Sequence, residues 1–457
     1  MTGRVPALRA LLARRSPATI RPGLRAVRRL LARLGDPQRG LAVVHVAGTN
    51  GKGSVIAFLE AILLAAGIPV ASYTSPHLIR FHERMRIDGR EITDAALNAL
   101  LTEVLAADPE EETTFFELTT AAALLHFARE GRFGSGGPGL VLLETGLGGR
   151  LDATNVVLPR LVVITTIAMD HEAYLGSTLA AIAREKAGIL KPGVPVVAAP
   201  GARVAQRVVR EVAGRLSAPL WLAGRDFHHS LPCCGPAAWL DWRFRLAGGG
   251  PWARMPAPAL PGGHQYANAA LALAGAVVLR GQGMRISLAH AWSGIAHARW
   301  PGRLECFPGT PPVWLDGAHN PSGMEALVRW VQNGGMGEPF VPITLIFSVV
   351  QHKNGQDMVH GLIPWVREVF TVPCGGERGR PPEELIGLWN VAPVAVTCLA
   401  DAGQALAAAR RSAGPGGRIL VTGSLFLVGE VRSLLLSSIS MPVAGVARRN
   451  ERKRGTA

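Results

Sequence analysis

A glycine-rich turn between a short apolar strand and a helix constrains the fold of this chain more than any other feature. The segment reads HVAGTNGKGSV over residues 45–55. It differs from the usual phosphate loop, because two residues rather than four separate Gly48 from the pair Gly51–Lys52. A strand that ends in glycines and continues into a helix places backbone N–H groups and the positive helix end around a phosphate. The turn therefore predicts a nucleotide site of variant design, with an ordinary glycine-rich turn as the alternative.

Strand-like and helix-like stretches alternate on both sides of this turn. The apolar runs lie at 41–48, 69–75, 140–146 and 161–170, and the helix-like stretches at 54–67, 94–107 and 116–130. Continuous apolar runs with helices between them are typical of buried strands in a parallel sheet. The pattern predicts an α/β fold, with a P-loop-type, mostly parallel sheet covered by helices on both faces.

Polar side chains follow several of these predicted strands at the point where each strand ends. Besides the glycine turn, the strand exits carry Ser75, Glu144 and the pair Asp170–His171. In open α/β sheets, ligands bind beyond the carboxyl ends of the strands. We therefore expect these groups to meet at one edge of one sheet.

The second half of the chain predicts a separate and smaller unit. Residues 224–263 are rich in Trp, Gly and Pro and indicate an irregular or antiparallel appendage, and 297–303 has the turn chemistry of a linker. A second strand and helix pattern then runs from about 312 to 435. For 457 residues we expect an ATP-binding domain over 1–296, a Rossmann-like α/β domain over 297–440 and a basic tail over 441–457.

The net charge of +15 is concentrated at the two ends of the chain. Residues 1–40 contain ten arginines and one acid, and residues 448–457 contain five basic residues and one acid, which leaves the body nearly neutral. We therefore expect no nucleic-acid partner. The spacing of apolar residues over 24–34 favours a structural helix over an Arg-rich transit peptide, which is the alternative. No apolar run is long enough to span a membrane.

Lysine and cysteine usage add two further constraints. The chain has 43 arginines but only five lysines, so a lysine inside a motif suggests chemistry that a guanidinium group cannot perform. Lys52 and Lys186 are such lysines, although Lys186 taken alone would be a solvated charge, and a lone His171 is more often structural. The five cysteines form no CxxC pair, which indicates reduced thiols and a cytoplasmic location.

From about Ile20 to Leu435 the chain resembles the folylpolyglutamate synthase/dihydrofolate synthase family of the Mur ligase superfamily. The resemblance rests on motifs in order along the chain: HVAGTNGKGSV, SPHLIRFHERMRIDG, TTFFELTTAAALLHF, ETGLGGRLDATN, ITTIAMDHEAYLG, EKAGILKPGVPVV, GGHQYANAALAL, WPGRLE, LDGAHNP and GSLFLVGEVR. The variant glycine turn is the form that this superfamily uses. The resemblance implies ATP-dependent amide formation between a folate-type carboxylate and L-glutamate, through an acyl phosphate and with release of ADP.

The resemblance also implies roles for individual residues. The implied ATP-binding residues are Thr49, Asn50, Gly51, Lys52, Gly53, Ser54, Asn268, Arg303 and Asp316. The implied ligands of one or two Mg²⁺ ions are Ser54, Ser75, Glu144, His171 and Lys186, the last as a carbamate formed with CO₂. The implied catalytic residues are Lys52, Lys186 and His171. The implied pterin-pocket residues are Leu151, Asp152 and Ala153, and the TIRPGL stretch near Ile20 is a further candidate for that pocket.

The chain departs from the family pattern in two places. Gln351, His352, Lys353 and Asn354 stand where many members have Asp-Lys-Asp, which removes the acids on either side of Lys353. Thr166 stands where Asn is common. Any metal or glutamate-site role that depends on the missing acids is therefore in doubt, whereas the triphosphate and metal positions are intact.

Two other functions remain as alternatives. A Mur ligase acting on a UDP-sugar peptide shares the turn and metal chemistry but normally has an additional N-terminal domain, and 44 residues precede the turn here. A non-enzymatic nucleotide-binding protein would use the basic ends. For the ligase we expect a monomer whose partners are ATP, L-glutamate and dihydropteroate or tetrahydrofolate derivatives, with a bifunctional enzyme favoured over a monofunctional one.

Overall fold

The strand that enters the glycine turn lies inside a mixed eight-stranded sheet. The computed structural model describes residues 5–14, 23–134, 136–230, 243–246, 253–337, 341–351, 353–374, 376, 379–390 and 393–440. The strands of this sheet are β1 (Val43–Ala47), β2 (Val70–Tyr73), β3 (Met85–Ile87), β4 (Arg90–Glu91), β5 (Leu140–Glu144), β6 (Leu161–Ile164), β7 (Val196–Ala198) and β8 (Leu220–Leu222). Their order is β4-β3-β2-β5-β1-β6-β7-β8, and β2, β5, β1, β6, β7 and β8 are parallel. The predicted parallel sheet is confirmed, and β3 and β4 extend its edge as antiparallel strands.

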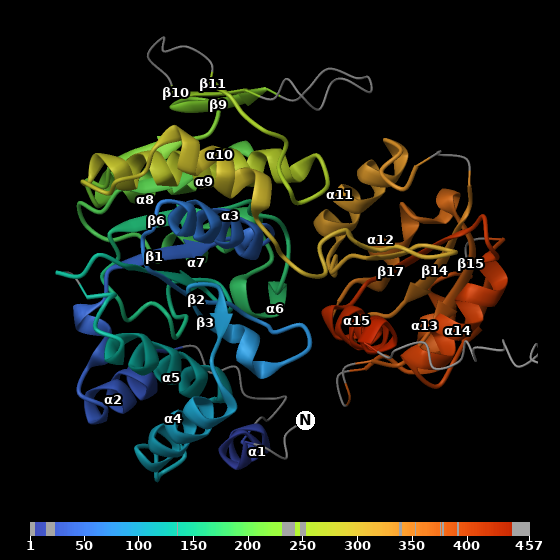
Figure 1. The fold of residues 1–457 in the computed structure, drawn as a ribbon, viewed down its shortest axis with the longest axis horizontal. Coiled ribbons are helices and arrows are strands. Elements are labelled where there is room, and N and C mark those ends of the chain that lie inside the picture. Colours follow the sequence, from blue (N-terminus) through green and yellow to red (C-terminus); the bar gives the residue numbers. More distant parts are fainter. Residues whose placement is uncertain are drawn as a thin grey trace, which may run out of the picture.

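Successive residues of β1 belong to the cores on opposite faces of the sheet. Val44 and Val46 pack in the cluster beneath α3, α9 and α10, whereas Val43 packs in the cluster on the other face. The first face carries α3 (Lys52–Ala65), α9 (His264–Gly281) and α10 (Leu288–His297). The opposite face carries α1 (Pro6–Ala13), α2 (Arg25–Arg33), α4 (Asp94–Ala106) and α5 (Phe115–Arg129) (Figure 1). Period-two alternation under helices on both faces gives the layered α/β arrangement.

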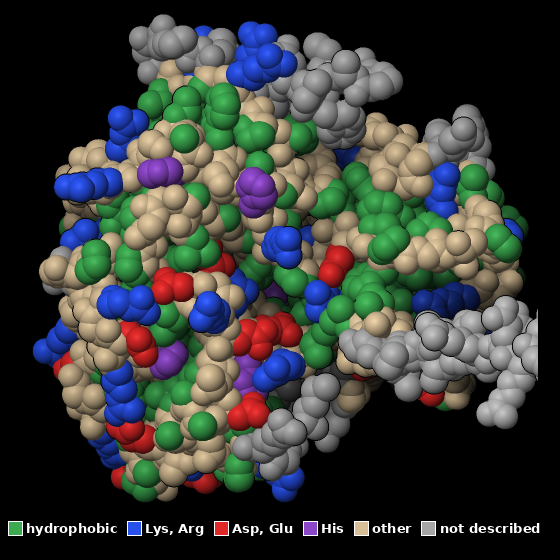
Figure 2. Space-filling model, viewed as in Figure 1, with side chains coloured by type: hydrophobic (Ala, Val, Ile, Leu, Met, Phe, Trp, Pro, Cys, Tyr) green, Lys and Arg blue, Asp and Glu red, His purple; other side chains and the backbone are tan. Residues whose placement is uncertain are grey.

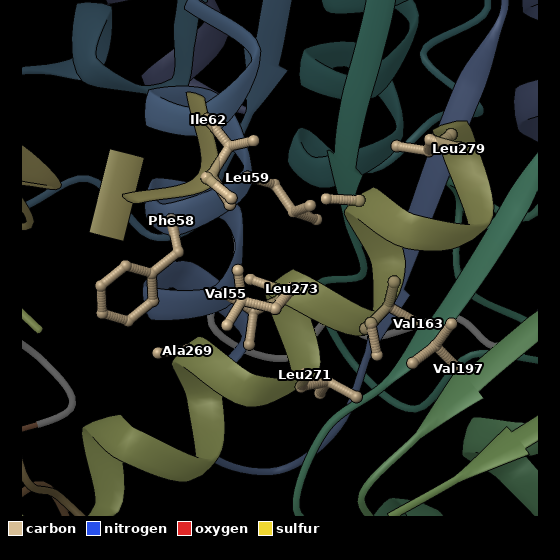
Figure 3. Packing of buried hydrophobic residues seen from close by; sticks show 14 of the residues in the cluster. Val55, Phe58, Leu59, Ile62, Val163, Val197, Ala269, Leu271, Leu273 and Leu279 are labelled. Atoms are coloured by element: carbon tan, nitrogen blue, oxygen red, sulfur yellow. The ribbon is translucent and has the colours of Figure 1, made fainter. Parts of the chain in front are cut away.

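Helices α3 and α9 interlock above the sheet. Figure 3 shows Val55, Phe58, Leu59 and Ile62 of α3 beside Ala269, Leu271, Leu273 and Leu279 of α9, with Val163 of β6 and Val197 of β7 next to the α9 side chains. The four labelled α3 side chains are fully buried. The helix that begins in the glycine turn is therefore a core element of the fold, and its first residues are fixed by this packing.

The first body has further helices after β6, two 3₁₀ turns earlier in the chain and a small separate sheet after β8. They are α6 (Glu172–Leu175), α7 (Leu179–Ala187), α8 (Arg203–Arg215), the 3₁₀ turns at Pro37–Gly40 and Phe81–Arg84, and a small sheet of β9 (Phe227–Ser230), β10 (Arg243–Leu246) and β11 (Ala253–Arg254). The small sheet is antiparallel, as expected for residues 224–263 in the part that is described. Cys233 and Cys234 lie outside the described residues.

The N-terminal arginines pair with an acidic turn. Arg14 contacts Asp108 at 3.0 Å, Arg33 contacts Glu110 at 2.6 Å, and Arg29 contacts Glu112. On the face drawn in Figure 2, basic and acidic side chains are interspersed over the first body. Since Val27, Leu30 and Leu31 are also buried, α2 (Arg25–Arg33) is the structural helix that the spacing over 24–34 predicts, and part of the local positive charge is neutralised within the fold.

A second α/β body follows the linker (Figure 1). Its strands are β12 (Glu305–Phe307), β13 (Val313–Leu315), β14 (Ile343–Phe347), β15 (Val366–Thr371), β16 (Ala395–Cys398) and β17 (Arg418–Thr422), in the order β12-β13-β17-β14-β15-β16. All pair in parallel except β12. Its helices are α11 (Pro321–Gln332), α12 (Gly355–His360), α13 (Pro382–Gly387), α14 (Ala402–Ala413) and α15 (Leu425–Ser440), with a 3₁₀ turn at Ile363–Trp365.

The two sheets fit the expected pair of α/β units. Helix α10 ends at His297 and β12 begins at Glu305, so the change of sheet falls within the predicted linker. The domain boundaries themselves stay a prediction, and the predicted tail over 441–457 lies outside the described residues. In the part of the chain that is described, the helices lack the combination of length and apolar character needed to cross a bilayer.

Candidate active site

The glycine turn is fastened to the segment that follows β6. Thr49 donates its backbone N–H to the Thr166 carbonyl at 2.7 Å, and the Thr165 hydroxyl donates to the Asn50 carbonyl at 2.8 Å. The Thr49 hydroxyl bridges the carbonyl and N–H of Ala168, both at 3.1 Å. Because Thr166 contributes its backbone carbonyl, the replacement of the family's Asn by Thr leaves this contact in place.

Two glycines are required by the conformation and packing of the turn. A methyl group built on Gly48 would lie 1.7 Å from the Thr165 hydroxyl oxygen, so no side chain fits there. Gly51 caps α3 with φ +91°, in the left-handed region, and a methyl group there would lie 2.5 Å from Oδ1 of Asn268. The variant turn is thus a specific backbone structure, and it brings Asn268 of α9 against the start of α3.

Lys52 bends back over the turn. Its Nζ donates to the Gly48 and Thr49 carbonyls at 3.2 and 3.3 Å and lies 3.9 Å from Oε1 of Glu144. An ammonium group in this position can reach the outer phosphates of a nucleotide held by the turn. The predicted link between the turn and the exit of β5 is present.

Ser54 and Asn268 are joined through a residue that we did not single out from the sequence. Gln265 donates its side-chain N–H to the Ser54 hydroxyl at 3.3 Å and accepts from Asn268 at 3.0 Å. All three side chains are buried. Gln265 belongs to the GGHQYANAALAL motif, but only its position on the face of α9 that meets α3 reveals this contact.

Glu144 is a buried carboxylate at the end of β5. The residue is only 4% exposed, and its Oε2 accepts the Ser75 N–H at 2.9 Å. Burial raises the pKa of Glu144, while the positive charge of Lys52 opposes that shift. A hard cation beside this carboxylate would offset the cost of burying its charge. The donor set therefore fits Mg²⁺, which takes oxygen ligands and keeps waters and phosphates as well.

Lys186 of α7 contacts the same glycine turn, although it lies 138 residues later in the sequence. Its buried Nζ donates to the Gly48 carbonyl at 2.9 Å, so it shares this acceptor with Lys52. Burial and the nearby charge of Lys52 lower the pKa of Lys186 to about 7. A substantial fraction of its amine is consequently neutral at physiological pH, which a solvated lysine would not be.

His171 caps the N-terminus of α6 in the segment that follows β6. Its backbone is left-handed, with φ +53°, and its Nε2 lies 3.9 Å from Oδ2 of Asp170. Burial and the charge of Lys353 lower the pKa of His171 to about 3, so the imidazole is neutral near pH 7. A neutral imidazole has the lone pair that a metal ligand needs.

Asp170 and Asn320 connect the two bodies. Asn320 donates to Oδ1 of Asn50 and to Oδ2 of Asp170, both at 3.0 Å, and Asn50 donates back to Oδ1 of Asn320 at 3.2 Å. Lys353 forms an ion pair with Asp170, and both side chains are more than nine-tenths buried. Lys353 therefore has an acidic partner across the interface although the acids beside it are missing. His352 lies outside the described residues.

The pairing of Asp170 affects its own titration. Burial raises the pKa of Asp170, but the charges of His171 and Lys353 outweigh burial and hold that pKa below its usual range. Asp170 is therefore an anion that anchors Lys353 and Asn320. The sequence indicates Asp170 only as a strand exit and assigns no role to Asn320, because the contacts of both residues join segments far apart in the chain.

The second body presents Arg303 and Asp316 near this interface. Asp316 accepts the backbone N–H groups of Leu304 at 3.0 Å and Ala318 at 2.9 Å. Burial raises the pKa of Asp316, and the charge of Arg303 opposes it. His319 contacts the Gly317 carbonyl at 2.8 Å, and burial lowers its pKa to about 4.

The predicted pterin-pocket residues have internal roles in the structure. Asp152 is buried and accepts the backbone N–H groups of Leu147 at 2.7 Å and Thr154 at 3.0 Å. Ala153 packs in the core, and Leu151 is half-buried. Phe116 packs against the same loop, since a methyl group on Gly146 would lie 2.4 Å from its ring. A pocket role for Leu151, Asp152 and Ala153 remains a prediction, and Ile20 lies outside the described residues.

Within the described residues, no group of three or more His, Cys, Asp or Glu side chains could hold a metal ion. The predicted ligand set differs in kind, because it combines one carboxylate and one imidazole with serine hydroxyls and a modified lysine. Mg²⁺ is usually held by one or two carboxylates together with waters and substrate phosphates. The arrangement around Glu144 is of this kind.

Known proteins match the chain along nearly its whole length. Residues 302–425 match the family model described as Mur ligase, glutamate ligase domain. A Bacillus subtilis protein named dihydrofolate synthase/folylpolyglutamate synthase is 35% identical over 424 residues, which cover 91% of this chain and 95% of the relative.

Two solved structures are similar in fold as well as in sequence. Escherichia coli FolC in complex with DHPP and ADP has a TM-score of 0.83 and 32% identity, over 95% of this chain and 98% of that one. A bifunctional folylpolyglutamate synthase/dihydrofolate synthase of Yersinia pestis, complexed with AMPPNP and Mn ion, has a TM-score of 0.80 and 31% identity, over 94% and 98%. These two relatives bind a nucleotide, in one case together with a divalent metal.

Proposed function

Because the chain belongs to the folylpolyglutamate synthase/dihydrofolate synthase family of the Mur ligase superfamily, we propose that it joins L-glutamate to a folate-type carboxylate in an ATP-dependent, ADP-forming ligation. The observation that carries this proposal is the convergence of Lys52, Glu144 and Lys186 on one glycine turn. These residues come from α3, β5 and α7, and the second body is held against the same turn through Asn50 and Asn320.

The ligation proceeds in two steps, phosphorylation of the carboxylate and formation of the amide. A carboxylate oxygen of the folate attacks the γ-phosphorus of ATP, the bond between that phosphorus and the bridging oxygen breaks, and ADP leaves. The amine of glutamate then attacks the acyl carbon, phosphate leaves, and the amine proton passes to a base or to water. The protein contributes positioning and charge neutralisation, because an acyl phosphate reacts readily with an amine once the two are held together.

Individual residues have distinct tasks in this proposal. The backbone from Thr49 to Gly53 cradles the triphosphate, Lys52 neutralises its outer phosphates, and Asn268, Arg303 and Asp316 contact the rest of the nucleotide. Ser54, Ser75, Glu144, His171 and carbamylated Lys186 would hold one or two Mg²⁺ ions. Bound Mg²⁺ supplies positive charge that stabilises the transferring phosphoryl group.

The environment of Lys186 supports its carbamylation. The neutral amine attacks CO₂, a C–N bond forms, and a proton is released, so that a cationic side chain becomes an anionic oxygen ligand. Only the neutral amine can react, and burial with the charge of Lys52 lowers the pKa of Lys186 to about 7. The change of sign would also relieve the repulsion between two lysines that share the Gly48 carbonyl.

We expect ligation to depend on CO₂ and on pH through Lys186. Below pH 7 the neutral fraction of its amine falls about tenfold per pH unit, so carbamate formation should fail there. Protein equilibrated at pH 6 in CO₂-free buffer should lose most of its ligation rate and recover it at pH 8 with bicarbonate. ADP release followed after each treatment provides the measurement, and full activity after exhaustive CO₂ removal would contradict the carbamate.

The same pKa shift predicts the sign of one stability effect. The unfolded chain keeps the Lys186 proton up to pH values near 10.5, while the folded chain releases it near 7. The unfolded state therefore binds more protons between these values, and the contribution of Lys186 to the free energy of unfolding rises with pH.

We further propose that the enzyme is bifunctional and accepts both dihydropteroate and tetrahydrofolate derivatives. The B. subtilis relative carries both names, and the E. coli structure contains DHPP. We propose a monomer and a cytoplasmic location, the latter because the described cysteines Cys306, Cys374 and Cys398 are unpaired.

One assay tests the function directly. Purified protein is supplied with ATP, Mg²⁺ and L-glutamate, together with dihydropteroate in one reaction and tetrahydrofolate in another. We expect ADP release and an amide product with both acceptors. Product with one acceptor only would make the enzyme monofunctional, and nucleotide binding without any amide product would favour the non-enzymatic alternative. A reaction with a UDP-sugar peptide in place of the folates distinguishes the other Mur ligases.

A further inference from the structure

The linker between the two bodies contacts the glycine turn through the side chain of Trp300. A methyl group built on Gly53 would lie 2.6 Å from Cζ2, 2.7 Å from Cε2 and 2.8 Å from Nε1 of Trp300. The indole ring therefore lies directly on the backbone of Gly53, in the first turn of α3. Gly53 lies within this helix, so the need for glycine here is one of space.

A largely buried ion pair also contacts the ring. The Arg86 guanidinium lies 5.0 Å from the centroid of the Trp300 ring, within cation–π range. Arg86 donates to Oε2 of Glu60 at 2.8 Å, and the Ser72 hydroxyl donates to Oε1 of Glu60 at 2.9 Å. Glu60 itself lies on α3, two turns after the phosphate-binding residues. Helix α3 therefore contacts Trp300 at Gly53 and also, through Glu60, holds the Arg86 side chain that contacts the same ring.

The linker is fixed to the first body before Trp300. Helix α10 packs closely on α3, because a methyl group on Gly294 would lie 2.5 Å from the backbone N of Ile62. Trp300 continues this contact toward the start of α3, where it packs against the same core.

The linker is fixed to the second body immediately after Trp300. Gly302 donates its N–H to Glu305 at 2.8 Å, and its carbonyl accepts the N–H of Gly317 at 2.8 Å. Leu304 donates to Asp316 at 3.0 Å. Only Pro301 separates Trp300 from these contacts, and Gly302 turns the chain with φ +71°. The position of Trp300 therefore bears directly on how the linker enters the second body.

We infer that Trp300 is a positioning residue for the ligation: held by its contacts with Gly53 and Arg86, which we call the clamp, it fixes the linker on the phosphate turn and thereby sets the location of Arg303 and of the second body. The inference rests on the proposed function for the role of Arg303. Glu60 and Arg86 act through the ring and touch no substrate. The contacts of Trp300 thus connect the phosphate turn to the point, one residue later, at which the linker passes to the second body.

Substitutions of Trp300 test the clamp. We expect Trp300→Ala to raise the KM for ATP and the dissociation constant of ADP by about tenfold and to lower kcat by a similar factor, since small misplacements of positioning groups are costly. Trp300→Phe keeps a ring over Gly53 and should stay within about threefold of the wild type. Hydrogen exchange of the backbone amides of residues 302–305 should become faster in Trp300→Ala and remain slow in Trp300→Phe.

The buried pair is tested through the same readouts. Arg86→Met removes the charge above the ring, and Glu60→Gln weakens the hold on Arg86, so both should change KM and linker exchange in the direction of Trp300→Ala. The double variant Arg86→Met/Trp300→Ala should be no worse than Trp300→Ala, because the two side chains act as one unit. These variants also carry the test if Trp300→Ala does not fold.

Matched controls separate the clamp from a general loss of packing. Trp292 of α10 is 44% exposed and far along the helix from the linker, and Arg90 of β4 is exposed. Trp292→Ala and Arg90→Met should leave KM, kcat and linker exchange unchanged. Unaltered ADP affinity and linker exchange in folded Trp300→Ala would overturn the inference. ADP binding and hydrogen exchange report on the clamp even if the wild-type protein proves to lack ligase activity.

Discussion

Lys186→Ala is expected to abolish ligation, with kcat lower by about three orders of magnitude, because it removes the group that would become the second anionic metal ligand. Lys186→Arg is expected to be equally inactive. A guanidinium group keeps the positive charge but does not form a carbamate with CO₂. Added short carboxylic acids should partly restore the alanine variant by supplying the missing oxygen ligand.

Ligation rates at saturating ATP, Mg²⁺ and glutamate measure this effect. Lys191 provides the matched control, because its Nζ donates to Asn155 at 2.6 Å and is assigned no part in the reaction. Lys191→Arg should therefore remain active, whereas Lys186→Arg should not. Wild-type turnover in Lys186→Arg would refute the carbamate. Thermal unfolding of each variant shows whether loss of rate reflects loss of fold.

Glu144→Gln is expected to lower kcat by about 10²–10³-fold while making the protein without nucleotide more stable. The amide keeps the shape of the side chain and can still accept the Ser75 N–H, but it lacks the charge that attracts Mg²⁺. Since burial raises the pKa of Glu144, the folded protein bears a cost for its charged form, and the amide removes this cost. A gain of roughly 1 kcal/mol would raise Tm by about 1–2 °C in a chain of this size.

Thermal unfolding with and without Mg²⁺ and AMPPNP distinguishes the two effects. Ligand that binds only the folded state raises Tm of the wild type, and this increase should be small in Glu144→Gln. Glu325, which is exposed on α11, supplies the control substitution Glu325→Gln, with rate and Tm close to wild type. A Glu144→Gln protein with wild-type rates would remove Glu144 from the metal site.

The order of polar groups along the sequence was sufficient to predict that several of them meet. Residues at the exits of parallel strands share one edge of a sheet, so the neighbourhood of Ser75, Glu144 and the glycine turn follows from the strand pattern alone. The same reasoning gave both α/β units and the antiparallel appendage. The fold followed from local patterns of apolar residues.

The contacts across the interface could not be predicted in this way. Lys353 lies in a segment that departs from the family pattern, and its pairing with Asp170 depends on how the two bodies dock. The role of Thr166 was likewise hidden, because it acts through its backbone and not through the side chain that the sequence records. Edge strands β3 and β4 are too short for their pairing direction to show in an apolar pattern.

The contact between the bodies joins a charge-free pair of amides, Asn50 and Asn320, to an ion pair, Lys353 and Asp170, that is almost sealed from water. Dissolved electrolyte screens exposed charges strongly and sealed ones weakly. The contact between the two bodies should therefore depend only weakly on ionic strength.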